Sequence, residues 1–216
     1  MKNKTRNFID FIFNLLIVIS TVWAVGDYYK SGPDALGSVG NACLKYFTTD
    51  SNILVGIAAL IMLIYNIARF AKPDAVMPKW VSVLKYTGTS AVALTLLTVV
   101  FFLGPVFAIM KGPAGYRLMF EGNTLILHLT TPLLAIISLL FFEKDNKFSK
   151  GDCLIACLPS FIYSIVYFTM VVVLKQWNDW YNFTLGGKTF MIPVALVSMY
   201  LATFAISALL RKLRKV

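Results

Sequence analysis

Charged residues are scarce in this 216-residue sequence, which has 14% Asp, Glu, Lys and Arg against 58% hydrophobic residues. A soluble domain carries about a quarter charged residues, so the composition excludes an ordinary soluble fold. Histidine occurs once, as His128, and cysteine three times, as Cys43, Cys153 and Cys157. This set provides neither a disulfide framework nor a recognisable zinc pattern, so the cysteines are expected to be small buried apolar residues.

Long apolar runs follow one another along the chain. Six are predicted to span a membrane, at about residues 8–26, 45–70, 81–109, 122–142, 153–174 and 189–210. Each has about 20 apolar residues, enough for a helix to cross ~30 Å of hydrocarbon. We therefore expect an all-α polytopic membrane protein with a single six-helix domain over residues 1–216. The basic start also resembles a signal peptide, but the first run is longer than a usual signal core, which favours a retained helix.

Basic residues are distributed unevenly over the connections. The termini and the second and fourth connections hold 13 of them, against six in the other three connections. The positive-inside rule then predicts that both termini are cytoplasmic. The net charge of +10 is explained by topology, so no nucleic-acid partner is expected.

The only histidine lies inside the fourth run, residues 121–142, which reads EGNTLILHLTTPLLAIISLLFF. On a helix, small and polar residues form one stripe at spacings of four, three, four and three: Thr124, His128, Thr131, Ala135 and Ser138. Because a lipid-facing surface has no use for such a stripe, it is expected to face other helices or a cavity. An imidazole at membrane depth is a functional-site hypothesis in its own right.

A comparable stripe lies on the second run, which opens KYFTTDSNILVG and places Thr48, Asn52, Gly56 and Ala59 on one face. The second and fourth runs cross the membrane in the same direction, so both begin at the predicted outer face. At 1.5 Å per residue, Thr48 lies ~5 Å and His128 ~8 Å below the starts of their helices. If the stripes face each other, a hydroxyl and an imidazole meet near the outer boundary.

This pairing has a chemical use. A hydroxyl is a weak nucleophile until an adjacent base takes its proton, and histidine is the usual base near neutral pH. Free backbone N–H groups in the first turns of both helices are expected to point to the same region and to stabilise an oxyanion. The competing interpretation is structural: threonines often hydrogen-bond to their own helix, and a lone histidine often bridges two helices.

Other polar residues near the pair are candidates to bind substrate or to orient the imidazole. They are Asn52, Ser51, Asp50, Asn123, Thr124 and Thr131. Asp50 is the only carboxylate that the sequence pattern places well inside a span, so it is a candidate to orient His128. For the nucleophile, Thr48 is favoured over Thr49, Ser51 and Cys43 because of its depth and the face that it shares with Asn52.

The segments KYFTTDSN and HLTTP resemble motifs of the androgen-induced-gene family of six-span membrane proteins and its bacterial relatives. Bacterial members show a similar FT-x-x-SN segment, followed later by a histidine four residues before a proline. The resemblance implies a membrane threonine hydrolase that cleaves fatty-acid esters of hydroxy fatty acids. Its nucleophile would be Thr48 and its general base His128, and it would need no metal or nucleotide cofactor. The expected location is a bacterial cytoplasmic membrane, with the site toward the outer face.

The resemblance is not complete. The animal motif has an aspartate three residues after the threonine, where this chain has Ser51, which leaves the substrate open. A related branch uses cysteine for acyl transfer, so an acyltransferase is a further possibility. A non-catalytic lipid-binding protein or a small transporter could also use the same polar cavity. The expected partners are the membrane and a lipid or fatty-acyl ester, which would need an apolar path past residues such as Phe101 and Phe102.

Overall fold

The computed structural model describes residues 3–31, 40–72 and 75–214, and within these ranges all regular structure is helical. The first part contains α1 (Asn3–Ser31), the 3-10 helix η1 (Gly40–Lys45), α2 (Phe47–Ala71), α3 (Lys79–Thr98), the π-helical turn η2 (Val99–Leu103), α4 (Gly104–Lys111) and α5 (Pro113–Leu118). The second part contains α6 (Gly122–Leu125), π-helical turns η3 (Ile126–Thr130) and η4 (Ser138–Phe142) around α7 (Thr131–Ile137), then α8 (Lys150–Ala156), α9 (Leu158–Phe168), the π-helical turn η5 (Thr169–Val173) and α10 (Met191–Leu213).

Among the described residues, six helical segments are long and apolar enough to cross a membrane, as predicted. They are Lys4–Ser31, Phe47–Ala71, Lys79–Lys111, Gly122–Phe142, Lys150–Val173 and Met191–Leu213. The main difference lies in the first span, which was expected to end at residue 26 and continues as helix to Ser31. The protein is therefore an all-α bundle of six membrane-spanning helices.

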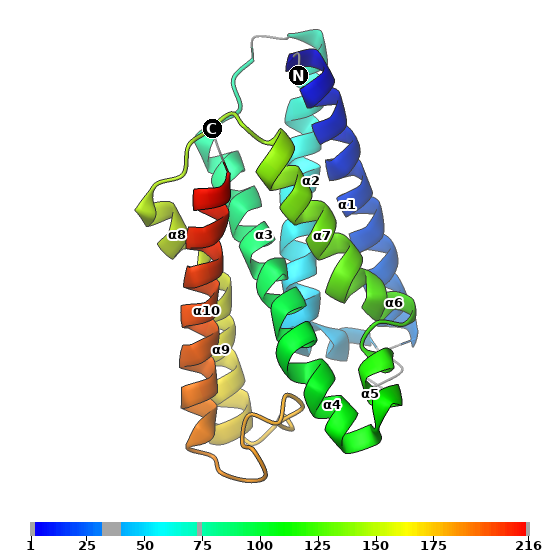
Figure 1. Ribbon diagram of the computed structural model, residues 1–216, viewed down its shortest axis with the longest axis vertical. Helices are drawn as coiled ribbons and strands as arrows, with labels where there is room; N and C mark the ends of the chain where they lie inside the picture. Colours follow the sequence, from blue (N-terminus) through cyan, green and yellow to red (C-terminus); the bar gives the residue numbers. More distant parts are fainter. Residues whose placement is uncertain (1–2, 32–39, 73–74, 215–216) are drawn as a thin grey trace.

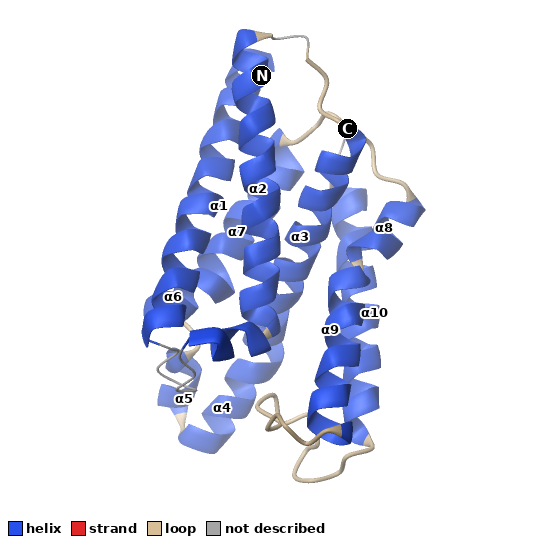
Figure 2. Ribbon diagram, turned by 180° about the vertical axis from the view of Figure 1, so that it is seen from behind, coloured by secondary structure: helices blue, strands red, loops and turns tan. Residues whose placement is uncertain are grey.

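Helix α3 lies in the middle of the bundle (Figure 1). It packs against α2 and α7 on one side and against α8 and α10 on the other, while α1 packs along α2 and α7. Figure 2 shows α1 and α2 side by side and α9 beside α10. Both chain termini lie toward the same end of the bundle, here called the terminal end (Figure 1). The opposite, distal end carries α5 and the connection of residues 174–190.

Proline explains two of the π-helical turns. Pro105 follows η2 and Pro132 follows η3, and a proline has no N–H to donate to the carbonyl four residues earlier. The backbone widens instead, and in η3 the N–H of Thr131 donates to the carbonyl of Ile126, five residues earlier. His128 lies at the centre of η3, so Pro132 shapes the backbone that carries the imidazole.

Glycine allows α2 and α3 to approach closely. A Cβ atom on Gly88 would lie 2.8 Å from the Cα atom of Val55, a distance that the backbone of α2 cannot relieve by a rotamer change. Helices in a membrane are held largely by such close packing, because lipid provides no hydrophobic drive between them.

We predict that Gly88→Ala destabilises the bundle, whereas Gly26→Ala does not. Both changes gain the ~0.5–1 kcal/mol helix preference of alanine over glycine, but only the first also introduces overpacking, which costs roughly 1–3 kcal/mol. A Cβ on Gly26 meets nothing within 4 Å. Thermal unfolding in detergent measures the difference, and equal stability of the two variants would contradict the close contact at Gly88.

Candidate functional site

Thr48 and His128 line the same cavity at the distal end of the bundle. Its other lining residues are Tyr28, Tyr46, Leu103, Phe107, Met119, Thr124, Trp180 and Tyr181. The cavity has a volume of about 40 Å³, room for about one water molecule, whose share of the liquid is ~30 Å³. A lipid ester would therefore have to displace some of these side chains in order to reach the two residues.

The hydrogen bond of the imidazole fixes its tautomer. The Nδ1 atom of His128 lies 2.7 Å from the carbonyl oxygen of Met119. A carbonyl only accepts, so Nδ1 carries the hydrogen of the neutral ring and Nε2 keeps the lone pair. The backbone of Met119 thus leaves His128 with a basic nitrogen in a cavity that Thr48 also lines.

Asn52 joins the helices that carry Thr48 and His128. Its Nδ2 atom donates to the carbonyl of Thr48 at 2.8 Å and to that of Leu127 at 3.0 Å. Asn52 is fully buried, and its Oδ1 atom has no hydrogen-bond partner among the described residues. This predicted residue therefore lies next to the pair, with its donor positioning both backbones.

Three of the backbone N–H groups at the start of α2 are not free, contrary to the expectation from sequence. The N–H of Phe47 donates to the hydroxyl of Tyr181 at 3.0 Å. Those of Thr49 and Asp50 both donate to the carbonyl of Tyr46, at 3.0 and 3.2 Å. These groups are occupied by the fold and provide no ready-made oxyanion hole.

A side chain of the cavity lining offers a hydrogen-bond donor instead of the backbone. Trp180 lines the cavity, and its buried Nε1–H makes no hydrogen bond of good geometry among the described residues; it interacts only weakly with the neighbouring Tyr181 hydroxyl. Sequence reasoning did not identify Trp180, because nothing in the local pattern shows that residues 174–190 fold back over the start of α2. This indole is the donor that the sequence-based prediction missed.

Two further candidates on the histidine-bearing span are used to hold neighbouring segments. The Nδ2 atom of Asn123 donates to the Asp27 carboxylate at 3.0 Å. The hydroxyl of Thr131 lies 3.0 Å from that of Ser20 on α1. The structure places both away from the cavity lining. Their contacts fix the orientation of the span and do not reach Thr48.

Thr124 lines the cavity, but its hydroxyl donates within its own turn, to the carbonyl of Glu121 at 2.6 Å.

Asp50 and Ser51 are not brought to the imidazole. The hydroxyl of Ser51 contacts the Thr95 hydroxyl at 3.0 Å, on the side of α3. Asp50 lines a separate groove of about 650 Å³ bounded by α2, α3 and α9. The helical register explains this, because one residue along a helix turns the side chain by about 100°.

The rival nucleophiles are also less well placed. Cys43 is buried in η1 outside the cavity lining, and burial raises the pKa of its thiol, with the nearby Asp50 carboxyl adding to the effect. A raised pKa leaves less of the reactive thiolate. Thr49 is fully buried and does not line the cavity.

Neighbouring cavities lie between Thr48 and the side of the bundle. A second cavity of about 20 Å³ shares Thr48 and Leu103 with the first. It shares Phe183 and Met199 with a groove of about 330 Å³ along α3 and α10. The predicted wall residue Phe102 lines this groove, whereas Phe101 is 75% exposed and points away. The cavities that Thr48 lines are small, and the groove beyond them is much larger.

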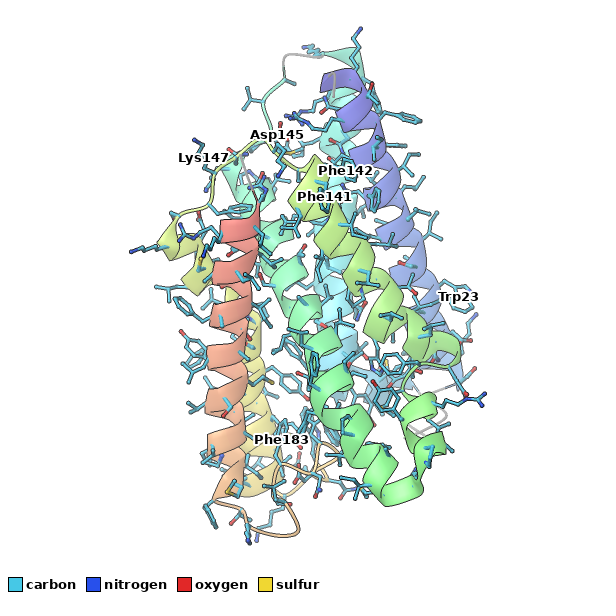
Figure 3. All side chains as sticks on the ribbon, in the orientation of Figure 1. Trp23, Phe141, Phe142, Asp145, Lys147 and Phe183 are labelled. Atoms are coloured by element: carbon cyan, nitrogen blue, oxygen red, sulfur yellow. The ribbon has the colours of Figure 1, made fainter. Side chains whose placement is uncertain are left out.

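Residues 174–190 cover the site and are held by one carboxylate. Asp179 accepts hydrogen bonds from the Tyr167 hydroxyl at 2.6 Å and from the N–H groups of Thr184 and Phe183 at 2.7 and 3.0 Å. Phe183 projects from this connection beside α3 (Figure 3). Burial alone would raise the pKa of Asp179, but these donors outweigh it and hold the pKa below its usual value.

Comparison with protein-family models, with curated proteins and with solved structures gives no match. The resemblance to the androgen-induced-gene family therefore rests on the two short motifs around Thr48 and His128.

We predict that acid loosens this connection through Asp179. A carboxyl whose pKa is lowered by folding stabilises the folded state above its unfolded pKa of about 3.9 and loses that contribution as the pH falls through the lower, folded value. Emission of Trp177 and Trp180 should shift to longer wavelength in that range.

The Asp179→Asn variant should show the shifted emission already at neutral pH, and Asn178→Ala, at the exposed neighbouring position, should not. An acid transition unchanged in Asp179→Asn would assign it to another group.

Proposed function

We propose that the protein hydrolyses lipid esters within the membrane, with Thr48 as nucleophile and His128 as general base. The observation that carries this proposal is the shared cavity. Thr48 and His128 both line it, and the Nε2 atom of the neutral imidazole keeps its lone pair. The two family-like motifs point to the same two residues and to fatty-acid esters of hydroxy fatty acids as the substrate class.

In the first half of the reaction, Thr48 Oγ1 attacks the ester carbonyl carbon while its proton passes to His128 Nε2. The tetrahedral intermediate then loses the alcohol, which takes that proton from Nε2, and an acyl-threonine remains. In the second half, His128 takes a proton from water, and the hydroxide formed attacks the acyl carbon. Thr48 Oγ1 leaves with the proton held by Nε2, and the free acid is released.

The developing oxyanion needs a donor. Trp180 Nε1–H is a donor of the cavity lining that makes no hydrogen bond of good geometry among the described residues, whereas the N–H groups of Phe47, Thr49 and Asp50 are already occupied. An unpaired buried N–H costs free energy in the resting protein, so a negatively charged oxygen that forms only during the reaction is a favourable partner.

The acyl chain would enter laterally through the groove along α3 and α10, whose lining is largely apolar. The terminal end of the bundle would face the cytoplasm, because the basic residues concentrate there, and the site would then lie toward the outer face. An acyl acceptor other than water would make the same chemistry an acyl transfer.

A second candidate function is lipid binding without catalysis. The observation that favours it is the groove of about 650 Å³ between α2, α3 and α9, which is far larger than the cavity at Thr48. Binding of a labelled lipid that is unaffected by loss of Thr48 and His128, in a protein without esterase activity, would favour this alternative.

We predict that Thr48→Ala and His128→Ala each reduce ester hydrolysis by on the order of 10³-fold or more and abolish labelling by a lipid phosphonate probe. The two residues act as one unit, so the double variant should be little worse than either single variant. Hydrolysis of a fluorogenic fatty-acid ester by the purified protein is the measurement.

Thr49→Ala is the matched control, because it removes the neighbouring hydroxyl, which does not line the cavity. Cys43→Ala should also remain active, and Thr48→Ser is compatible with the scheme. Full activity of Thr48→Ala would refute it.

A separate prediction concerns Trp180. Trp180→Phe keeps an aromatic ring against Tyr46 and Trp177, at ring-centroid distances of 5.1 and 5.2 Å in the native protein, and removes only the N–H. Loss of one oxyanion donor should lower kcat by about 10²-fold or more, with little change in KM. Trp177→Phe should keep kcat, because Trp177 lines the groove of about 650 Å³ between α2, α3 and α9 and not the cavity at Thr48. Equal effects of the two substitutions would assign Trp180 a packing role.

A further inference from the structure

A second polar cluster lies at the terminal end of the bundle, far along the helices from Thr48 and His128. It consists of Asp10 and Asn14 on α1, Asn66 on α2, Lys85 on α3, Ser138 in η4 and Glu143 just after it. None of them is more than 3% exposed. Asp10 lies seven residues, or ~10 Å, inside α1. Sequence reasoning named Asp50 as the interior carboxylate, and the structure places Asp10 and Glu143 in that position.

The ammonium group of Lys85 already fills the cation position of the cluster. Its Nζ atom lies 3.0 Å from Glu143 Oε1 and 2.5 Å from Asn14 Oδ1. The Asn14 amide in turn donates to Asp10 Oδ1 at 2.9 Å. Lys85 therefore pairs directly with Glu143 and reaches Asp10 only through Asn14.

The charges of the cluster do not balance if both carboxyls are ionised. Arg214, at the end of α10, spends its guanidinium on the backbone carbonyls of Glu143 and Asn146. Arg69 and Arg6 pair with Asp145 at 2.9 and 3.6 Å, nearer the end of the bundle where Figure 3 shows Asp145. The Lys85 ammonium thus pairs directly with only one of two buried carboxyls, while the Arg214 charge acts from farther out. A second carboxylate without a direct cationic partner is strongly unfavourable in this setting.

The hydrogen bonds also lack one hydrogen. Ser138 Oγ lies 2.7 Å from Glu143 Oε1 and 3.3 Å from Asp10 Oδ1, but a hydroxyl has a single hydrogen to donate. If it donates to Glu143, the contact with Asp10 requires a hydrogen on Asp10.

The Asn66 amide offers an alternative acceptor for a hydrogen on Asp10, at the other carboxyl oxygen. Its Nδ2 atom contacts Asp10 Oδ2 at 2.9 Å, and its buried Oδ1 has no donor among the described residues. Turning this amide over would bring Oδ1 to Asp10, where only a protonated carboxyl could donate to it.

We propose that this cluster is a proton-binding site, in which Asp10 carries one exchangeable proton that is shared through Ser138 with Glu143. The proton leaves Asp10 neutral and Glu143 paired with Lys85, which balances the charges and supplies the hydrogen missing at Ser138. It would exchange with the terminal end of the bundle, past the Glu143 carboxyl.

Loss of this proton would expose Asp10 to like charge from Glu143 and Asp145, with Lys85 and, farther out, Arg69 and Arg214 as the compensating cations. Because α1, α2, α3 and η4 all contact the cluster, deprotonation would loosen their packing at the terminal end. The proposal does not rest on ester hydrolysis, which is assigned to the distal end.

Infrared spectroscopy of the purified full-length protein in lipid nanodiscs at neutral pH tests the proposal. The carbonyl stretch of a protonated carboxyl is separate from the bands of carboxylates and shifts in D2O. The native protein should show this band, and Asp10→Asn should lose one carboxyl equivalent of it. Asp50→Asn is the matched control, because Asp50 is also a carboxyl within a membrane-spanning helix, α2. This substitution should leave the Asp10 band in place.

Stability gives a second readout. Asparagine resembles a neutral aspartic acid, so Asp10→Asn should keep the thermal stability of the native protein, whereas Asp10→Ala should lose part of it. Glu143→Gln should be strongly destabilising, because it strands the Lys85 ammonium. Absence of the band from the native protein, its persistence in Asp10→Asn, or failure of Asp10→Asn to fold would each overturn the proposal.

Discussion

The amide of Asn52 is the interaction on which the candidate site depends most directly. It donates to the carbonyl of Thr48 on α2 and to that of Leu127 in η3. Inside a membrane no water is at hand to replace such a donor, so each carbonyl left unpaired costs free energy. The irregular turn before Pro132 displaces the usual helical hydrogen bonds around His128, and Asn52 supplies one of the donors that this turn needs. The same atom therefore ties the nucleophile helix to the histidine-bearing turn and fixes their relative depth.

Most of the fold could be predicted from the sequence because a membrane span requires little more than length and apolar composition. The end of α1 could not. Asp27 looks like a loop residue, but it accepts a hydrogen bond from Asn123, and the helix continues past it to Ser31. That contact joins residues 96 positions apart in the chain, so no local pattern reveals it.

The placement of Thr48 and His128 in one cavity follows from two simple rules, the constant rise of a helix and the shared direction of two spans. The surroundings of the pair follow from neither. Tyr181 and Trp180 come from a connection that folds back over α2, and they decide which donors are occupied and which are free. For a similar reason, sequence reasoning selected Asp50 and not Asp10 as the carboxylate in the interior of the bundle. Both lie within a few turns of a helix end, and only packing shows that Asp10 faces Lys85 through Asn14 while Asp50 faces a groove.

The two polar regions differ in their supply of hydrogens, and the packing keeps them apart. The distal cavity has a donor to spare, Trp180 Nε1–H, which suits an oxygen that becomes negative during a reaction. The terminal cluster is one hydrogen short, which suits a group that holds a proton. Between them on all four helices lies a layer of fully buried apolar residues: Ile17, Val55, Ala59, Val92 and Ala135. Such a layer contains no group that could relay a proton. This layer favours coupling of the two regions through helix packing rather than through proton transfer, and it favours a supply of protons and water to Thr48 and His128 from their own side of the membrane.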